Sequence, residues 1–348
     1  LTPSEALDAL HERARAILPD SVLAYYDSGA GDGITVDEAT AAWNTWRLRP
    51  RALRDVAAVS TASTVLGTHL AAPVVVAPSA AHRLAHPDGE SATAAGTAAA
   101  GSLMVLSTRS TTRMSTVAGV GAPWWMQVYV LRDRGVSDEI AAQAAAHGAR
   151  ALVLTGDTPI VAPKPRGPVP ELPGEALLPV IEERPDNLLR QAADVTVDDI
   201  SRLAEISGLP VLVKGVLRPD DAHACVDAGA AGVVVSNHGG RQLDGAVHSA
   251  WALPEVAETV GDRGLVLVDG GVRTARHVLV ALAMGAQAVL VGRPVLWALA
   301  VGGADGVAGL LRSLAADLEV QLALAGCRDA SDAASDLIWQ AARSSRSV

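Results

Sequence analysis

A unit of one short apolar strand and one alanine-rich helical stretch repeats along most of this chain, and this repeat constrains the fold more than any other feature. Eight short segments between residues 73 and 294 are apolar and rich in β-branched residues, and enough chain for a helix separates each pair. Similar small-residue turns, HGARALVLT, AGAAGVVVS and MGAQAVLVG, run into three of them. The expected strands are 73–79, 103–108, 124–129, 151–157, 210–215, 232–237, 265–271 and 288–294.

Eight strand–helix units predict a closed parallel barrel, because eight strands close around an interior that side chains fill. The alternative is a doubly wound open sheet, but no GxGxxG follows the first strand. We therefore expect an α/β fold, a (β/α)8 TIM barrel, as a single domain over residues 1–348. Its expected parts are an N-terminal helical extension (1–72), the barrel (73–300), a proline-rich lid after the fourth strand (159–190) and C-terminal helices (301–348).

The composition narrows the range of partners. The chain has 348 residues, a net charge of -10 and only 3% aromatic residues, which argues against nucleic acid because phosphate binding needs a basic face. The two cysteines have neither metal-ligand spacing nor the density of a disulfide scaffold. No apolar run reaches the roughly 20 residues of a membrane span, and the first residues lack a signal-peptide core. We expect a cytoplasmic homo-oligomer with no membrane span and no metal.

Polar residues collect where the expected strands end. In an eight-stranded barrel the C-terminal ends of the strands meet on one face, which carries the active site. Such convergence of hydroxyls, amides and charges exceeds what connecting loops need. In strand order these residues are Pro78, Ser79 and Ala80, then Ser107 and Arg109, Gln127 and Tyr129, Thr155 and Asp157, Lys214, Ser236, His238 and Arg241, Asp269 to Arg273, and Gly292 with Arg293.

The last two strands predict a phosphate site. They end in DGGVR (269–273) and GRP (292–294), so glycine amides, a helix N-terminus and the charges of Arg273 or Arg293 face one point. The alternative is a pair of glycine-rich turns with no ligand. Because no dinucleotide fingerprint is present, we expect a terminal monophosphate, and hence FMN rather than FAD. The polar edge of a flavin suits Ser79, Ser107, Gln127 and Thr155, with the ammonium of Lys214 beside the ring.

The segment SNHGGRQLDG (236–245) supplies candidate catalytic groups. His238 is a base poised near neutral pH that can take a proton from a bound substrate. Asp157 can orient that imidazole and stabilise its charged form. Arg241 presents a fixed fork to a substrate carboxylate, and Tyr25 and Tyr129 supply further hydrogen bonds.

The motif SNHGGRQLDG resembles the signature of the FMN-dependent α-hydroxy acid oxidases and dehydrogenases. The resemblance covers nearly the whole chain through YYDSGA, APSA, LST, QVY, TGDTP, LVKG, LVDGGVR and VGRP in order. It implies oxidation of a 2-hydroxy acid to the 2-oxo acid, with oxygen or another acceptor taking the electrons. It makes His238 the base with Asp157 as partner, and Tyr25, Tyr129 and Arg241 the substrate binders. It assigns to FMN Pro78, Ser79, Ala80, Ser107, Gln127, Thr155, Lys214, Ser236, Asp269, Gly270, Gly271, Val272, Arg273, Gly292 and Arg293.

Two departures from that family affect the substrate site. Lys164 stands where the relatives carry the second arginine of a basic pair, and an ammonium offers a point charge instead of a fork. Arg109 occupies a position that resembles the family's substrate-facing, usually apolar or aromatic, site after the second strand. If Arg109 faces the pocket, a substrate with a second anionic group is expected. The alternative is a solvated loop arginine.

Other interpretations remain open at this level. A flavin-using isomerase on the same barrel would lack the pair of His238 and Arg241 and would show a basic diphosphate site. A non-catalytic flavin-binding protein would not need an intact base, acid and carboxylate partner. An oxidoreductase of the same fold acting on an atypical substrate is favoured by Lys164 and Arg109.

Overall fold

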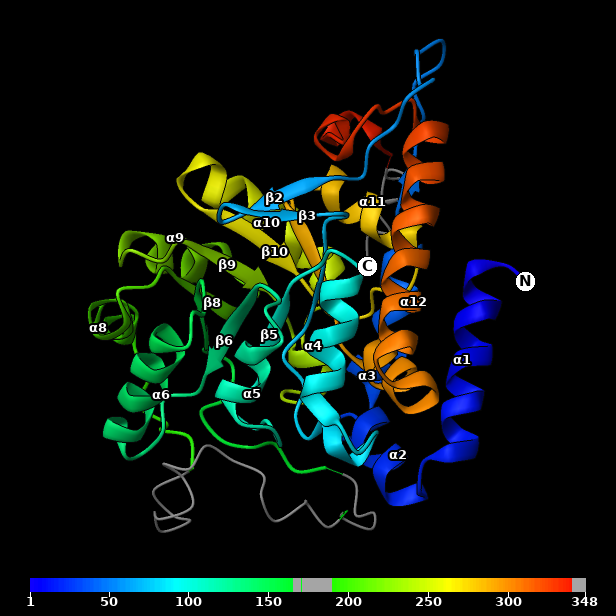
Figure 1. The fold of residues 1–348 in the computed structure, drawn as a ribbon. Coiled ribbons are helices and arrows are strands. Elements are labelled where there is room, and N and C mark those ends of the chain that lie inside the picture. Colours follow the sequence, from blue (N-terminus) through cyan, green and yellow to red (C-terminus); the bar gives the residue numbers. More distant parts are fainter. Residues whose placement is uncertain (165–169, 171–189, 340–348) are drawn as a thin grey trace.

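The structure is a computed structural model that describes residues 1–164, 170 and 190–339. Its centre is a closed barrel of eight parallel strands in the order β10-β11-β4-β5-β6-β7-β8-β9, which confirms the predicted fold (Figure 1). Each observed strand lies inside an expected segment except β8, which runs one residue further. The strands are β4 Val74–Val76, β5 Met104–Leu106, β6 Trp124–Val128, β7 Leu152–Thr155, β8 Val211–Val216, β9 Gly232–Val235, β10 Leu265–Val268 and β11 Ala288–Val291.

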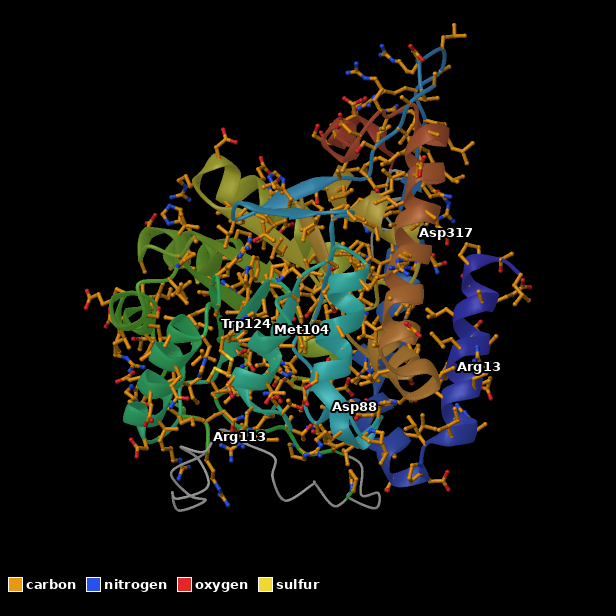
Figure 2. The ribbon with its side chains drawn as sticks, viewed as in Figure 1. Arg13, Asp88, Met104, Arg113, Trp124 and Asp317 are labelled. Atoms are coloured by element: carbon orange, nitrogen blue, oxygen red, sulfur yellow. The ribbon has the colours of Figure 1, made fainter. Side chains whose placement is uncertain are left out.

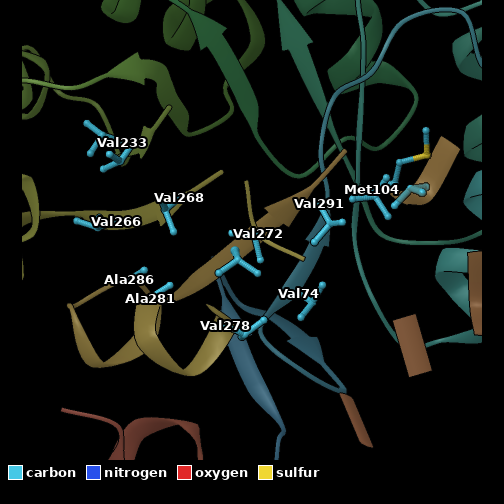
Figure 3. Packing of buried hydrophobic residues seen from close by; sticks show 14 of the residues in the cluster. Val74, Met104, Val233, Val266, Val268, Val272, Val278, Ala281, Ala286 and Val291 are labelled. Carbon is cyan, nitrogen blue, oxygen red and sulfur yellow. The ribbon is translucent and has the colours of Figure 1, made fainter. Parts of the chain in front are cut away.

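Helices surround the barrel and cover the outer faces of its strands (Figure 1). Strand residues such as Val74, Val233 and Val268 pack outward against helix residues such as Val278 and Ala281 (Figure 3). Met104 and Trp124 are register partners at the starts of β5 and β6 and lie close together in Figure 2. The helices are α4 Gly89–Ala99, α5 Met114–Gly119, α6 Arg134–Ala146, α8 Asp198–Ser207, α9 Pro219–Asp227, α10 Ser249–Val260, α11 Ala275–Ala283 and α12 Arg293–Ala325.

A second apolar cluster fills the inside of the barrel. Val75, Trp125 and Leu267 point inward and are fully buried, as expected where a strand alternates between two buried faces. Val65 and Leu70 of the hairpin formed by β2 (Ser63–Val65) and β3 (Thr68–Leu70) join this cluster. The hairpin closes the end of the barrel at which the strands begin (Figure 1). The hairpin therefore closes the barrel interior at this end, and a ligand can enter only at the opposite end.

The N-terminal extension, expected to be helical over residues 1–72, is helical only as far as Asn44, and the rest of it contains the short strands β1 (Arg47–Leu48), β2 and β3. Helix α1 (Pro3–Ile17) begins with a capping box in which Thr2 and Glu5 exchange hydrogen bonds, and it packs along α12 (Figure 1). Helices α2 (Asp20–Asp27) and α3 (Ile34–Asn44) come next, and β1 pairs antiparallel with β12 (Ile338–Trp339). The 3-10 turns are η1 His82–Leu84, η2 His238–Gly240, η3 Gly261–Arg263, η4 Ala330–Asp332 and η5 Ser335–Leu337.

Helix α12 changes two expectations. It begins at Arg293, so the boundary expected at residue 300 falls inside it. Between Ala325 and Trp339, the last described residue, the chain forms 3-10 turns and β12 rather than further helices. The helix breaks at Gly302 and Gly303 and then continues to Ala325. By length and composition α12 is apolar enough to cross a membrane, but 61% of its most apolar window is buried inside the fold. We interpret it as a core helix that packs on α1, α4 and α11.

Candidate active site

A cavity of about 430 Å³ opens at the C-terminal ends of the barrel strands. Most of the predicted lid over residues 159–190 lies outside the described residues. Of the predicted site residues, Asp157 and Ser236 do not line the cavity but hydrogen-bond to residues that do. Those that line it are Tyr25, Pro78, Ser79, Ala80, Ser107, Arg109, Gln127, Tyr129, Thr155, Lys164, Lys214, His238, Arg241, Asp269, Gly270, Gly271, Val272, Arg273, Gly292 and Arg293.

Two half-buried arginines face the cavity near the start of α12. Arg273 stacks over the ring of Trp297 and donates to the carbonyl of Val272, while Arg293 donates to backbone carbonyls of Tyr26, Ser28 and Gly239. Burial lowers the pKa of Arg273 to about 10, and burial with its cationic neighbours lowers the pKa of Arg293 to about 9. Within the described part of the chain neither forms an ion pair. Two half-buried cations beside a helix N-terminus fit a phosphate group.

Lys214 extends from β8 into the centre of the site. Its Nζ lies 3.1 Å from Asp269 Oδ2 and donates to Ser236 Oγ at 2.9 Å. Burial opposes the charge of Lys214, but Asp269 and Asp157 outweigh it and raise the pKa above its usual value. The ammonium is therefore permanently charged and fixed in position, as stabilising a developing negative charge on a bound ring requires.

The side-chain amide of Gln127 is held in one orientation. Its Oε1 accepts from the backbone N of Thr108 at 3.0 Å and from Ser107 Oγ at 3.4 Å, and its Nε2 donates to Thr155 Oγ1 at 2.9 Å. All of these groups come from the ends of β5, β6 and β7. They form a polar wall of fixed donors and acceptors beside Lys214, whose register partner on the neighbouring strand is Thr155, and the wall suits the edge of a polar heterocycle.

His238 and Asp157 form the predicted pair. His238 Nδ1 lies 2.9 Å from Asp157 Oδ1, so Nε2 is the ring nitrogen left for the cavity. The backbone of His238 has a φ of 58°, unusual for a residue other than glycine, and its N donates to Ser236 Oγ at 3.0 Å. Burial alone raises the pKa of Asp157, but His238 and Lys214 outweigh burial and hold the pKa below its usual value. Asp157 is thus ionised and holds the imidazole of His238 in place through Nδ1.

Arg241 lies on the same wall. Its Nη1 donates to the carbonyls of Tyr25 at 2.8 Å and Ser28 at 2.9 Å, and its guanidinium stands 5.4 Å from the centroid of the Tyr25 ring. These contacts fix the group and leave its other edge toward the cavity. Burial raises the pKa of Tyr129 to about 12, so its hydroxyl stays protonated and can donate. Tyr26, which the sequence did not single out, donates to the carbonyl of Ala81 and is structural.

Two other residues of the segment HGGRQLDG (238–245), Gln242 and Asp244, hold neighbouring segments in place. Asp244 accepts from the backbone N of Asp32, Ile34 and Thr35 and so caps α3 from outside the helix. Gln242 Nε2 donates to the carbonyls of Asp157 and Ile160, and its Oε1 accepts from Ala162 N. Gln242 lines the cavity and was not singled out, although it directly follows the predicted site residue Arg241.

A buried carboxylate below the rim was also missed. Glu90 of α4 accepts from the backbone N of His82 at 3.1 Å, from Thr111 N and Oγ1 at 2.8 Å each, and from Thr112 Oγ1 at 2.8 Å. These bonds tie the loop after β4 to the loop after β5. Glu90 lies three residues after Pro87, in a helix of small residues. The only sign of its role in the sequence was a charge within this stretch of small residues.

Comparisons with known proteins agree with this site. Residues 14–340 match the family described as FMN-dependent dehydrogenase. The chain is 42% identical to an L-lactate oxidase of Nostoc sp. (strain PCC 7120 / SAG 25.82 / UTEX 2576), covering 92% of this chain and 93% of that protein. It is 38% identical to human 2-hydroxyacid oxidase 1, covering 91% and 92%. A solved mandelate oxidase with (S)-4-hydroxymandelic acid superposes with a TM-score of 0.90 at 37% identity, covering 96% and 98%.

Proposed function

The chain belongs to the FMN-dependent dehydrogenase family, and from this we propose how its own residues divide the work of the reaction. The protein is an FMN-dependent oxidoreductase that converts a 2-hydroxy acid into the corresponding 2-oxo acid. The observation that carries the residue assignment is that the His238–Asp157 pair and the free edge of Arg241 face one cavity.

Residues on two sides of the cavity would hold FMN. The first turn of α12, together with Arg273 and Arg293, takes the phosphate, because both cations line the cavity and neither has an ion-pair partner among the described residues. Lys214 and the wall built around Gln127 take the polar edge of the ring. When bound, FMN supplies the acceptor for the two electrons that leave the hydroxy acid.

Substrate binding and proton transfer are carried out by Arg241, Tyr129 and His238, which also line the cavity. Arg241 holds the substrate carboxylate with the edge that the carbonyls of Tyr25 and Ser28 leave open, and Tyr129 donates to the hydroxyl or carboxylate. His238 Nε2 takes a proton from the hydroxyl or the α-carbon, and Asp157 stabilises the imidazolium that results. The names of the relatives, L-lactate oxidase and 2-hydroxyacid oxidase 1, favour oxygen as the final electron acceptor.

Replacing His238 by alanine tests this assignment. We expect substrate-driven bleaching of the flavin absorption to slow by about 10² or more, the usual contribution of a positioned base, while the flavin stays bound. His223→Ala is the matched control, because His223 is exposed on α9 and does not line the cavity. Bleaching of His238→Ala at the wild-type rate would mean that His238 is only a structural residue of its loop.

A further inference from the structure

The carboxylate that partners His238 lies beyond the end of its strand. Strand β7 ends at Thr155, and Gly156 N donates to the carbonyl of Lys214 at 2.8 Å, one residue past the paired strand. Asp157 comes next, and its position decides whether Oδ1 stays 2.9 Å from His238 Nδ1. Burial raises the pKa of Asp157, but the charges of His238 and Lys214 lower it, so Lys214 also attracts this carboxylate. A contact outside the strand must therefore hold Asp157 toward His238.

Gln242 holds the backbone of the segment that begins at Asp157. Its Nε2 donates to the carbonyl of Asp157 at 3.1 Å and to the carbonyl of Ile160 at 3.0 Å, and its Oε1 accepts from Ala162 N at 3.3 Å. The three bonds also settle which way the amide points, because the reverse orientation would set its oxygen against two carbonyl oxygens. Both N–H groups of the side chain are thus used on one short segment.

The same glutamine belongs to the loop that carries the base. Gln242 follows Arg241 directly, and the turn before them, η2, has a left-handed backbone at all three of its residues, with φ of 58°, 63° and 75°. This loop contacts Asp157 twice, through the side chain of His238 at Oδ1 and through the side chain of Gln242 at the carbonyl. One contact leaves Asp157 free to turn about it, whereas two contacts from one tight turn do not.

We propose that Gln242 is a positioning residue of the proton-transfer step, which holds the backbone of Asp157 so that its carboxylate stays on His238 instead of moving toward Lys214. This inference rests on the proposed function, in which His238 takes the proton. The imidazole gains a positive charge in that step, and a carboxylate that is already held in place stabilises this charge without having to move. Gln242 therefore acts on the reaction through Asp157.

Two substitutions remove the donors of Gln242 and keep its size. Gln242→Met loses all three hydrogen bonds, whereas Gln242→Glu keeps an acceptor for Ala162 N and sets oxygen against two carbonyls. We expect the limiting rate of flavin bleaching by L-lactate, followed by stopped flow, to fall by about 10- to 100-fold in both variants, the scale of a misplaced catalytic group. The Kd of L-lactate from the same traces should change far less, because Arg241 still binds the carboxylate. An unchanged limiting rate in both variants would overturn the proposal, because a glutamine that only fills space is replaced by either side chain.

The Asp157→Asn background separates this role from a direct contact with the substrate, which is the alternative because Gln242 lines the cavity. If Gln242 acts through the Asp157 carboxylate, adding Gln242→Met to Asp157→Asn should slow bleaching by no more than about twofold, the margin within which independent effects add. Effects that multiply in the double variant would overturn the proposal.

Gln287→Met is the matched control. Gln287 also accepts from a backbone N–H, that of Val266 at 2.6 Å, but it precedes β11 at the opposite end of the barrel and does not line the cavity. It should bleach at the wild-type rate.

Hydrogen exchange of the holoenzyme gives a readout independent of turnover. The N–H of Ala162 should exchange faster in Gln242→Met, which has lost the acceptor, than in Gln242→Glu, which keeps one. Equal exchange in the wild type and Gln242→Met would overturn the role of Gln242, because the segment would then be held without it. Bleaching of His238→Ala at the wild-type rate would refute the proposed function of the His238–Asp157 pair and this role with it. Wild-type bleaching in both Gln242 variants beside a slow His238→Ala would overturn the role of Gln242 alone.

Discussion

Gly215 lies directly behind the carboxylate that partners His238, and its replacement by alanine is expected to displace that group. Gly215 has a φ of 103° and sits at an irregularity in the pairing of β8 with β9. An added Cβ would lie 2.5 Å from both Cβ and Cγ of Asp157 and 2.9 Å from its backbone N. Carbon atoms in contact need about 3.5–4.0 Å, so Asp157 must move by roughly 1 Å.

The cost has two parts. A left-handed backbone in a residue with a Cβ costs on the order of 1–3 kcal/mol, and overpacking a buried site costs about 1–3 kcal/mol more. A displacement of Asp157 by roughly 1 Å from His238 reduces the rate by about 10², the scale known for misplaced catalytic groups. Gly215→Ala should therefore lower both the free energy of unfolding and the rate of flavin bleaching.

Gly229→Ala separates the two parts. Gly229 has a φ of 89°, but an added Cβ there would meet no atom within 4 Å. It should show the backbone cost alone, with wild-type bleaching. Urea unfolding and stopped-flow bleaching of both variants provide the comparison. If Gly215→Ala loses no more stability than Gly229→Ala and bleaches at the wild-type rate, Gly215 does not support Asp157.

Two further predictions concern buried charges. Lys214→Met leaves the buried Asp269 carboxylate unpaired and should lower the free energy of unfolding, measured by urea titration, by about 3–5 kcal/mol. Adding Asp269→Asn to this variant should restore part of the lost stability. No recovery in the double variant would contradict the pairing. His277 Nδ1 accepts from the backbone N of Arg273, and burial, together with the charges of Arg276 and Arg273, lowers the pKa of His277 to about 3. The contribution of His277 to the free energy of unfolding is therefore intact above pH 6.5. It declines as pH falls below that value, because only the unfolded chain takes up the proton. Between pH 6.5 and 5 the free energy of unfolding should fall by about 1 kcal/mol per pH unit because of this group, and His277→Gln should flatten that slope. An unchanged slope in His277→Gln would mean that another group causes the pH dependence.

The repeat of strand and helix determined the barrel before any contact was known, because hydrophobic period and strand length are local properties. The same holds for the rim. Residues such as Gln127, Lys214 and His238 follow apolar runs directly, and closing eight parallel strands brings all such positions to one face. The expected strands were mostly too long, since the polar residues at their ends leave the ladder and turn into the cavity.

Only the tertiary structure decided what supports the rim. Glu90 joins two loops, Asp244 caps a helix more than 200 residues earlier in the chain, and Gly215 gives Asp157 its space. Each role depends on a partner far away in sequence, so no local pattern carries it. The same reason applies to Arg109 and Lys164. Their charges are visible in the sequence, but that both line the cavity of Arg241 follows from the way the barrel closes.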